Sequence, residues 1–299
     1  MKTTMQGRIL QALLALTSAA GAAMAQDDSA CNGHVELCDK RYSEVSFAAA
    51  HNAAFVGTSP SHNQHEYPEG QFDRGVRVFT TQTHDKDGAI EQCHSDCLLL
   101  DVGPFSELLA SLKGKLDASP REVATLLITN GADNIDIEKF GDAFVDAGLD
   151  GYVFQPDGDL GLADWPTLGQ LIDAGTRLVV FMDYNADTSK VPYILEEFKY
   201  FFETPFSPTD DNFYQCDIDR PSDATADNMM IWVNHDLNDS IFGILVPAQD
   251  DAADTNSLDA ITKQTDICQS NYGRVPNVVM YDFVDKGDVI AAQDKFNGF

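Results

Sequence analysis

Four of the seven histidines in this 299-residue chain follow apolar, strand-like stretches: His51, His84, His94 and His235. Histidine has a pKa near neutral pH, so two histidines beside a carboxylate can supply a general base, a general acid and an orienting anion. A single histidine in such a place is more often a hydrogen-bonded structural group. Several histidines that converge on one site favour acid-base catalysis.

His51 stands in the stretch AAHNAAF, residues 49–55. The surrounding alanines leave room for a substrate, whereas a cluster of leucines would have indicated burial. The neighbouring Asn52 is a candidate substrate-binding residue, with a role as a turn former as the alternative.

Asp183 and Asp282 each lie at the end of an apolar run, where a strand would meet solvent. Their carboxylates could orient a histidine or bind a substrate, and capping of a following helix is the structural alternative. Asn185 follows closely and is a further candidate substrate ligand, again with a turn as the alternative.

The elements that must position these side chains can be read from the apolar pattern. Stretches rich in Val, Ile, Leu and Phe predict strands over residues 46–51, 77–84, 89–94, 123–130, 177–184, 229–235, 243–246 and 277–283. Amphipathic stretches predict helices over residues 105–116, 137–147, 167–174 and 192–202. Runs such as ATLLIT and RLVVFM are apolar throughout, which is typical of parallel strands covered on both faces. The pattern predicts an α/β fold, a single (β/α)8 TIM-type barrel with its catalytic groups at the carboxyl ends of the strands.

Within the second predicted strand, alternation places Gln82 and His84 on one face. If Gln82 points into the mouth of the barrel, His84 does too. Both are therefore candidate substrate-binding residues.

Residues 1–25 have the pattern of a secretory signal peptide, with Lys2 and Arg8 ahead of an apolar run that ends in Ala23-Met24-Ala25. We expect an extracellular protein in which residues 26–299 form one domain. Loss of the two basic residues would take the formal net charge from −29 to −31. Such a surface repels nucleic acid and anionic bilayers, so we expect neither nucleic-acid binding nor stable membrane anchoring, and we expect a monomer.

The six cysteines of an exported chain predict three disulfides among 15 possible pairings. Short loops favour Cys31–Cys38 and Cys93–Cys97, which leaves Cys216–Cys268. A zinc site is the rival interpretation, but the chain lacks matching CxxC pairs. The single sequon, Asn238-Asp239-Ser240, predicts an exposed glycosylation site at Asn238.

These segments resemble the X-domain of phosphatidylinositol-specific phospholipase C. AAHNAAF, QFDRGVRVFTTQTHDKDG and CHSDC have the order and spacing of its first-histidine, Gly-x-Arg and second-histidine segments. The longer strings LLITNGAD and PNVVMYDFVDKGD are similar to exported fungal PLC-like phosphodiesterases, and the similarity extends over nearly the whole mature chain.

The resemblance implies a barrel that cleaves a phosphodiester next to a ring hydroxyl, in an inositol lipid, a glycosyl-phosphatidylinositol anchor or a related soluble diester. His51 would deprotonate the attacking hydroxyl to give a cyclic phosphate, and His94 would protonate the leaving alcohol. Asp282 would orient a histidine.

One departure concerns the positive charge that the phosphorane needs. The family uses Ca²⁺ held by acidic residues, or an arginine, but the corresponding positions here are Thr80, Gln82 and Thr129. The cofactor therefore stays open. A metal could bind elsewhere, through His84, Asp85, Asp183 or Asp282; a basic residue such as Lys190 could reach in; or the enzyme could be weak or altered.

Two other functions compete with this one. An inactive barrel could bind an inositol or sugar headgroup, or a metal-dependent phosphodiesterase could act on a soluble substrate. The scarcity of basic residues favours a soluble or cell-wall-linked substrate over an anionic bilayer. The sequence lacks the GxSxG motif of serine hydrolases and the GxGxxG nucleotide-binding turn.

Overall fold

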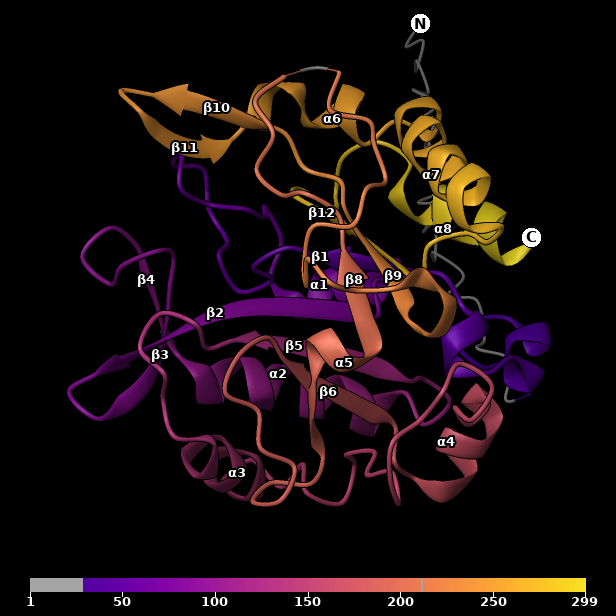
Figure 1. Cartoon of the computed structure of the whole chain (residues 1–299). Helices are drawn as coiled ribbons and strands as arrows, with labels where there is room; N and C mark the ends of the chain where they lie inside the picture. Colours follow the sequence, from indigo (N-terminus) through magenta and orange to yellow (C-terminus); the bar gives the residue numbers. More distant parts are fainter. Residues whose placement is uncertain (1–28, 211) are drawn as a thin grey trace, which may run out of the picture.

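Eight parallel strands form one curled sheet, a half-barrel, in the computed structural model, which describes residues 29–210 and 212–299 (Figure 1). The strands run in the order β7-β6-β5-β2-β1-β12-β9-β8. Their bounds are β1 (Phe47–Ala50), β2 (Val78–Lys86), β5 (Ala124–Thr129), β6 (Leu178–Met182), β7 (Ile194–Glu196), β8 (Phe201–Glu203), β9 (Met230–Asn234) and β12 (Val278–Tyr281). The predicted α/β barrel-type fold is confirmed, with β7 and β8 as the two edges of the sheet. The predicted signal peptide lies outside the described residues.

Two predicted strands lie outside the parallel sheet. β3 (Ala89–Cys93) pairs antiparallel with β2 and with β4 (Asp101–Pro104). β11 (Ile244–Pro247) pairs with β10 (Asn238–Ile241) in a separate two-stranded hairpin. The stretches 89–94 and 243–246 are therefore extended, as predicted, but they do not belong to the barrel.

The helix predicted over residues 192–202 is wrong. This segment contains β7, the single-turn helix α5 (Glu197–Tyr200) and β8. Ile194 and Leu195 pack into different hydrophobic clusters, as neighbours in a strand do. A short run that is apolar on every face fits a buried strand as well as a buried helix, so its periodicity could not separate the two.

The other predicted helices are confirmed, in α2 (Phe105–Ala118), α3 (Ile137–Asp146) and α4 (Leu168–Ala174). The remaining helices are α1 (Pro68–Arg74), α6 (Ala252–Thr255), α7 (Leu258–Tyr272) and α8 (Val289–Asn297), with short 3-10 turns at Val35–Asp39, Tyr42–Glu44, Ala226–Asn228 and Gln249–Asp251. α2 and α3 cover one side of the sheet and α7 and α8 another (Figure 1). No helix in the described ranges is long and apolar enough to cross a membrane.

The strands of the sheet are buried on both faces, which explains their apolar sequences. Along β1, Phe47 and Ala49 join one hydrophobic cluster, while Ala48 and Ala50 join the cluster that contains the helices. Period-two alternation therefore directs the next odd position, His51, to the side that Ala49 faces.

The three disulfides pair as predicted: Cys31–Cys38, Cys93–Cys97 and Cys216–Cys268. The second bond closes a five-residue loop directly after β3, and this loop contains His94. The third bond links residues 52 positions apart and joins α7 to the segment after β8.

Candidate active site

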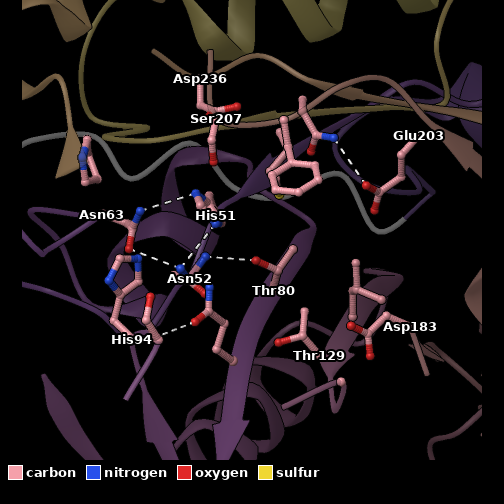
Figure 2. A pocket seen from close by; sticks show the side chains of 18 of the residues that line it. His51, Asn52, Asn63, Thr80, His94, Thr129, Asp183, Glu203, Ser207 and Asp236 are labelled. Atoms are coloured by element: carbon pink, nitrogen blue, oxygen red, sulfur yellow. Dashed lines mark hydrogen bonds between the residues drawn. The ribbon is translucent and has the colours of Figure 1, made fainter. Parts of the chain in front are cut away.

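A cavity of about 420 Å³ lies at the carboxyl ends of the parallel strands, where a barrel places its functional groups (Figure 2). Most of its polar lining comes from strand ends and the loops that follow them. These residues are His51, Asn52, Asn63, Thr80, Gln82, Thr83, His84, His94, Ser95, Thr129, Asp183, Glu203, Ser207, Arg220, Asn234, Asp236 and Asn238.

His51 follows β1 and is held from both ring nitrogens. Its Nδ1 lies 2.9 Å from Oδ1 of Asp282, which follows β12, and its Nε2 lies 3.2 Å from the side-chain nitrogen of Asn52. Asn63 donates a 2.7 Å hydrogen bond to the same carboxylate oxygen of Asp282. When the His51 ring is neutral and its Nδ1 proton is directed at Asp282, the lone pair lies on Nε2, next to the cavity. Figure 2 shows the amides of Asn52 and Asn63 beside the ring.

The backbone at Asn52 is in the left-handed region, with φ 48°, which asparagine tolerates better than most residues. Its N–H donates to Oγ1 of Thr80 on β2 at 2.8 Å, and its side chain donates to Oδ1 of Asn63 at 3.2 Å. Asn52 therefore acts as part of the turn and also lines the cavity.

The pKa of His51 is raised above the ordinary value of a histidine. Burial opposes the imidazolium, but the charge and hydrogen bond of Asp282 outweigh it, with help from the carboxylates of Asp236 and Glu203. His51 therefore holds a proton more readily than an ordinary histidine does.

His94 enters the cavity from the disulfide loop after β3. The loop is also held by Gln82, whose Oε1 accepts a 2.9 Å hydrogen bond from the N–H of Ser95. The His94 ring packs edge-on against Phe55, with ring centres 5.9 Å apart. Burial and then the nearby His51 lower the pKa of His94 to about 4. In the ligand-free protein, a single proton shared by the two histidines therefore resides on His51.

Two further carboxylates line the cavity, Asp183 on the side away from His94 and Asp236 near His51 (Figure 2). Asp183 follows β6 and accepts from two backbone N–H groups, those of Asn130 at 2.7 Å and Tyr184 at 2.6 Å. Burial outweighs these hydrogen bonds and raises the pKa of Asp183 to about 6. Burial and the neighbouring Asp282 raise the pKa of Asp236, after β9, to about 6 as well.

Arg220 supplies a permanent positive charge to the part of the cavity that Glu203 lines. Its guanidinium pairs with Glu203 at the end of β8 and lies over the ring of Phe206, 4.4 Å from the ring centre. Among the described lining residues it is the only lysine or arginine. Lys190, the basic residue considered from the sequence, instead pairs with Asp136 and Glu138 on the exposed surface.

The residues present do not fit a Ca²⁺ site, which requires six to eight oxygen ligands rich in carboxylates. Thr80 and Gln82 are neutral, and their side-chain oxygens already accept backbone hydrogen bonds. Within residues 29–210 and 212–299, no group of three or more His, Cys, Asp or Glu side chains could hold a metal ion.

Three of the candidate residues taken from the sequence do not line the cavity. Asp85 pairs with Lys139 at 2.8 Å, outside the cavity, which argues against its candidacy as a metal ligand. Asn185 also lies outside, where its side chain donates to Asn134 at 2.7 Å. His235 is buried beneath the cavity, and both of its ring nitrogens are hydrogen-bonded, to Gln264 and to the backbone of Thr255.

The prediction that Asn238 is exposed is wrong. The Asn238 side chain is buried, and its nitrogen donates a 2.7 Å hydrogen bond to Asp236. Because Asn238 lines the cavity, a glycan on this nitrogen would have to occupy part of the cavity.

The sequence interpretation missed Asn63, Glu203 and Arg220. Glu203 was not recognised as the end of a strand, because the residues before it were predicted to form a helix. It directly follows the apolar pair Phe201-Phe202. Asn63 and Arg220 lie in loops. Loops have no hydrophobic periodicity, so no local sequence pattern could have predicted that these residues line the cavity. His84, in contrast, lines the cavity together with Gln82, as the alternation along β2 predicted.

Comparisons with known proteins identify the family of this chain. The PI-PLC X family model matches residues 37–297. A PI-PLC X domain-containing protein 1 from Arthroderma benhamiae is 48% identical over 97% of this chain and 96% of its own length. An uncharacterized secreted protein from the same fungus is 39% identical over 87% of this chain, which spans 61% of that relative.

Solved structures with the same fold include the phosphatidylinositol-specific phospholipases C of Listeria monocytogenes and Staphylococcus aureus. The first has a TM-score of 0.56 and 14% identity over 88% of this chain and 96% of its own. The second has a TM-score of 0.57 and 15% identity over 88% of this chain and 95% of its own. At this identity the likeness establishes the fold alone. From the family match and the long sequence similarity, this chain belongs to the PI-PLC X domain family.

Proposed function

We propose that this protein is an exported phosphodiesterase that cleaves an inositol-phosphate diester, or a related diester with a neighbouring hydroxyl, by histidine acid-base catalysis. The observation that carries the proposal is the convergence of His51, bonded to Asp282, with His94 and Arg220 on one cavity. Membership of the PI-PLC X domain family supports the reaction type.

In the proposed reaction, Nε2 of His51 accepts the proton of the attacking ring hydroxyl, whose oxygen then bonds to phosphorus. The P–O bond to the leaving alcohol breaks, and His94 protonates the departing oxygen. The products are a cyclic phosphate and a free alcohol. Asp282 stabilises the imidazolium that forms on His51, because its carboxylate lies on the opposite ring nitrogen.

Arg220 is proposed to supply the charge that Thr80, Gln82 and Thr129 lack. Its guanidinium would attract the anionic diester and stabilise the additional negative charge of the phosphorane. Glu203 holds the arginine, and Asn234 in turn donates to Glu203 at 3.2 Å, so the guanidinium is positioned before substrate arrives.

The assigned roles require the proton to move between the histidines when substrate binds. In the ligand-free protein the proton resides on His51, whereas the reaction needs a neutral His51 and a protonated His94. An anionic diester between the rings favours protonation of His94, because an opposite charge stabilises the imidazolium. Substrate binding thus favours the protonated form of His94 that a general acid requires.

The test measures release of inositol phosphate from phosphatidylinositol and from a soluble inositol phosphodiester, with and without EDTA. His51→Ala and His94→Ala should each lower kcat by about 10²–10⁴-fold, which is the usual contribution of a general acid or base.

His65→Ala is the matched control. His65 also lies 2.9 Å from an aspartate, Asp285, but its other ring nitrogen is occupied by Gln249 and it lies outside the cavity. Equal rates for wild type and His51→Ala would overturn the proposal. Saturable inositol binding without turnover would instead identify a headgroup-binding barrel.

A further inference from the structure

A second, much smaller cavity adjoins the candidate active site. Its volume is about 10 Å³, which is about the space that one water molecule requires, and Asp236 and Asp282 both line it. Asp236 also lines the large cavity, so it separates the two. Figure 2 shows Asp236 near His51, the ring to which Asp282 is hydrogen-bonded. The small cavity therefore lies next to the carboxylate that orients the proposed base.

Each of these two carboxylates has one oxygen that is buried and unpaired. Within the described residues, Oδ1 of Asp236 and Oδ2 of Asp282 have no hydrogen-bond partner. The other oxygen of Asp236 accepts a 2.7 Å hydrogen bond from Asn238. The other oxygen of Asp282 accepts from Asn63 and lies 2.9 Å from Nδ1 of His51. Buried polar atoms are nearly always paired with protein or with an ordered water, so the two unpaired oxygens indicate a shared partner.

The shared partner must be a hydrogen-bond donor, because the groups that face it are acidic. Burial and then the neighbouring Asp282 raise the pKa of Asp236 to about 6, and the imidazolium of His51 partly opposes this shift. His235 also lines the small cavity, but both of its ring nitrogens are already hydrogen-bonded, and burial lowers its pKa. A water molecule has two protons to donate, one for each unpaired oxygen.

We propose that Asp236 is a positioning residue for His51, and that it acts through one buried water that fills the small cavity and donates to both Asp236 and Asp282. Asp282 is then held at both oxygens, so its carboxylate cannot turn away from Nδ1 of His51. When Asp236 is ionised, its negative charge also stabilises the imidazolium of His51. The inference rests on the proposed function only for its effect on rate.

Two variants separate the charge of Asp236 from its hydrogen bond. Asp236→Asn keeps the shape and a hydrogen-bonding group but removes the charge, whereas Asp236→Leu removes both. The pKa of His51, followed by NMR of its ring nitrogens in the ligand-free protein, should fall in both variants, because the charge of Asp236 helps to raise it. The fall should be smaller than in Asp282→Asn, because Asp282 contributes a hydrogen bond as well as a charge.

The orientation of the His51 ring should distinguish the two variants. In Asp236→Asn the water can accept from the new amide and still donate to Asp282, so neutral His51 should keep its proton on Nδ1 and kcat should stay close to that of wild type. In Asp236→Leu the water loses a partner and Asp282 can rotate. The Nδ1-protonated form should then be less populated, and kcat should drop about tenfold to a hundredfold.

Asp183→Asn is the matched control for the pKa measurement. Asp183 lines the large cavity and its pKa is also raised to about 6, but it is not among the carboxylates that raise the pKa of His51. This variant should leave the pKa of His51 unchanged. Thermal unfolding at pH 7 checks the folding of the Asp236 variants. Asp236→Asn should be at least as stable as wild type, because a buried carboxylate that is ionised costs free energy.

A high-resolution crystal structure of the wild type should show one water within hydrogen-bond distance of both Asp236 and Asp282. Absence of that water would overturn the inference, as would an unchanged pKa of His51 in Asp236→Asn. A wild-type proportion of the Nδ1-protonated ring in Asp236→Leu would reject the positioning role. None of these three measurements requires turnover, so a failure to cleave any diester would reject the proposed function alone.

Discussion

His51 and His94 reach the same cavity by different structural means. His51 follows β1 and is fixed by side-chain hydrogen bonds with Asp282 and Asn52, while Asn63 donates to the same oxygen of Asp282. His94 follows an antiparallel strand outside the barrel, in a loop closed by Cys93–Cys97, and its ring contacts Phe55.

The difference explains the opposite pKa shifts. A buried histidine loses the stabilisation of its charge by water, and only a neighbouring carboxylate restores it. His51 has Asp282 for this purpose, while His94 is affected by burial and by the adjacent His51. The hydrogen-bond network therefore sets the proton affinity of His51, and the covalent loop sets the position of His94.

The largest effect among the following predictions is expected for Arg220→Met. Loss of the guanidinium removes the positive charge that is proposed to stabilise the phosphorane, so kcat/KM should fall about 10²–10³-fold while both pH limits stay in place. Steady-state kinetics on the soluble diester measure this. Arg74→Met, which breaks an exposed pair with Glu66, is the control and should retain activity. Full activity of Arg220→Met would remove the arginine from the mechanism.

Asp282→Asn acts mainly on the His51 side, because Asp282 is hydrogen-bonded to His51. The rate should fall on the order of 10²-fold, because the imidazolium formed in the reaction loses its carboxylate. The pKa of His51 should also fall, since Asp282 is the main group that raises it, and the basic limit of the pH profile should move to lower pH. Asp285→Asn, which alters the His65 pair outside the cavity, should leave that limit unchanged. An unshifted limit in Asp282→Asn would contradict this account.

Cys93→Ser/Cys97→Ser alters only the His94 side. Without the bond the loop gains freedom, and kcat should drop about tenfold to a hundredfold, as expected when a catalytic group is misplaced by about an ångström. The basic limit, which belongs to His51, should not move. The control Cys216→Ser/Cys268→Ser should lower the free energy of unfolding by about 4 kcal/mol, because its loop is long, without the same loss of kcat. Wild-type kcat in the first variant would show that the disulfide does not position His94.

The smallest effect concerns the pH profile of the wild type. The active form carries one proton on the histidine pair, so kcat/KM should fall below about pH 4, where His94 of the free enzyme also becomes protonated. It should fall again above the raised pKa of His51, where the shared proton is lost. An acidic optimum in the rate of soluble-diester cleavage is therefore expected. A profile centred on alkaline pH would contradict it.

Much of the histidine side could be predicted from the sequence. His51, Asp282 and Gln82 each follow or end an apolar strand, and strand ends of a parallel sheet meet at one edge. Two disulfide pairs followed from short spacing, and the third was the pair that remained. Local pattern was sufficient in these places because β1, β2 and β12 are neighbours in the sheet.

The opposite side of the cavity depended on tertiary structure. Glu203 ends a three-residue strand whose apolar sequence fits a helix equally well, and Arg220 lies in an irregular segment. Only the packing of β8 against β9 brings them into the cavity, and a loop residue has no periodicity that could have predicted its position.

The sequence by itself determined the fold type, the histidine pair and the cysteine pairing, because periodicity, residue type and short spacing are local properties. The tertiary structure decided which of eight extended stretches enter the barrel, which cation faces the substrate cavity, and that Asn238 is buried. These outcomes depend on contacts between residues far apart in the chain, and on the desolvation that those contacts impose.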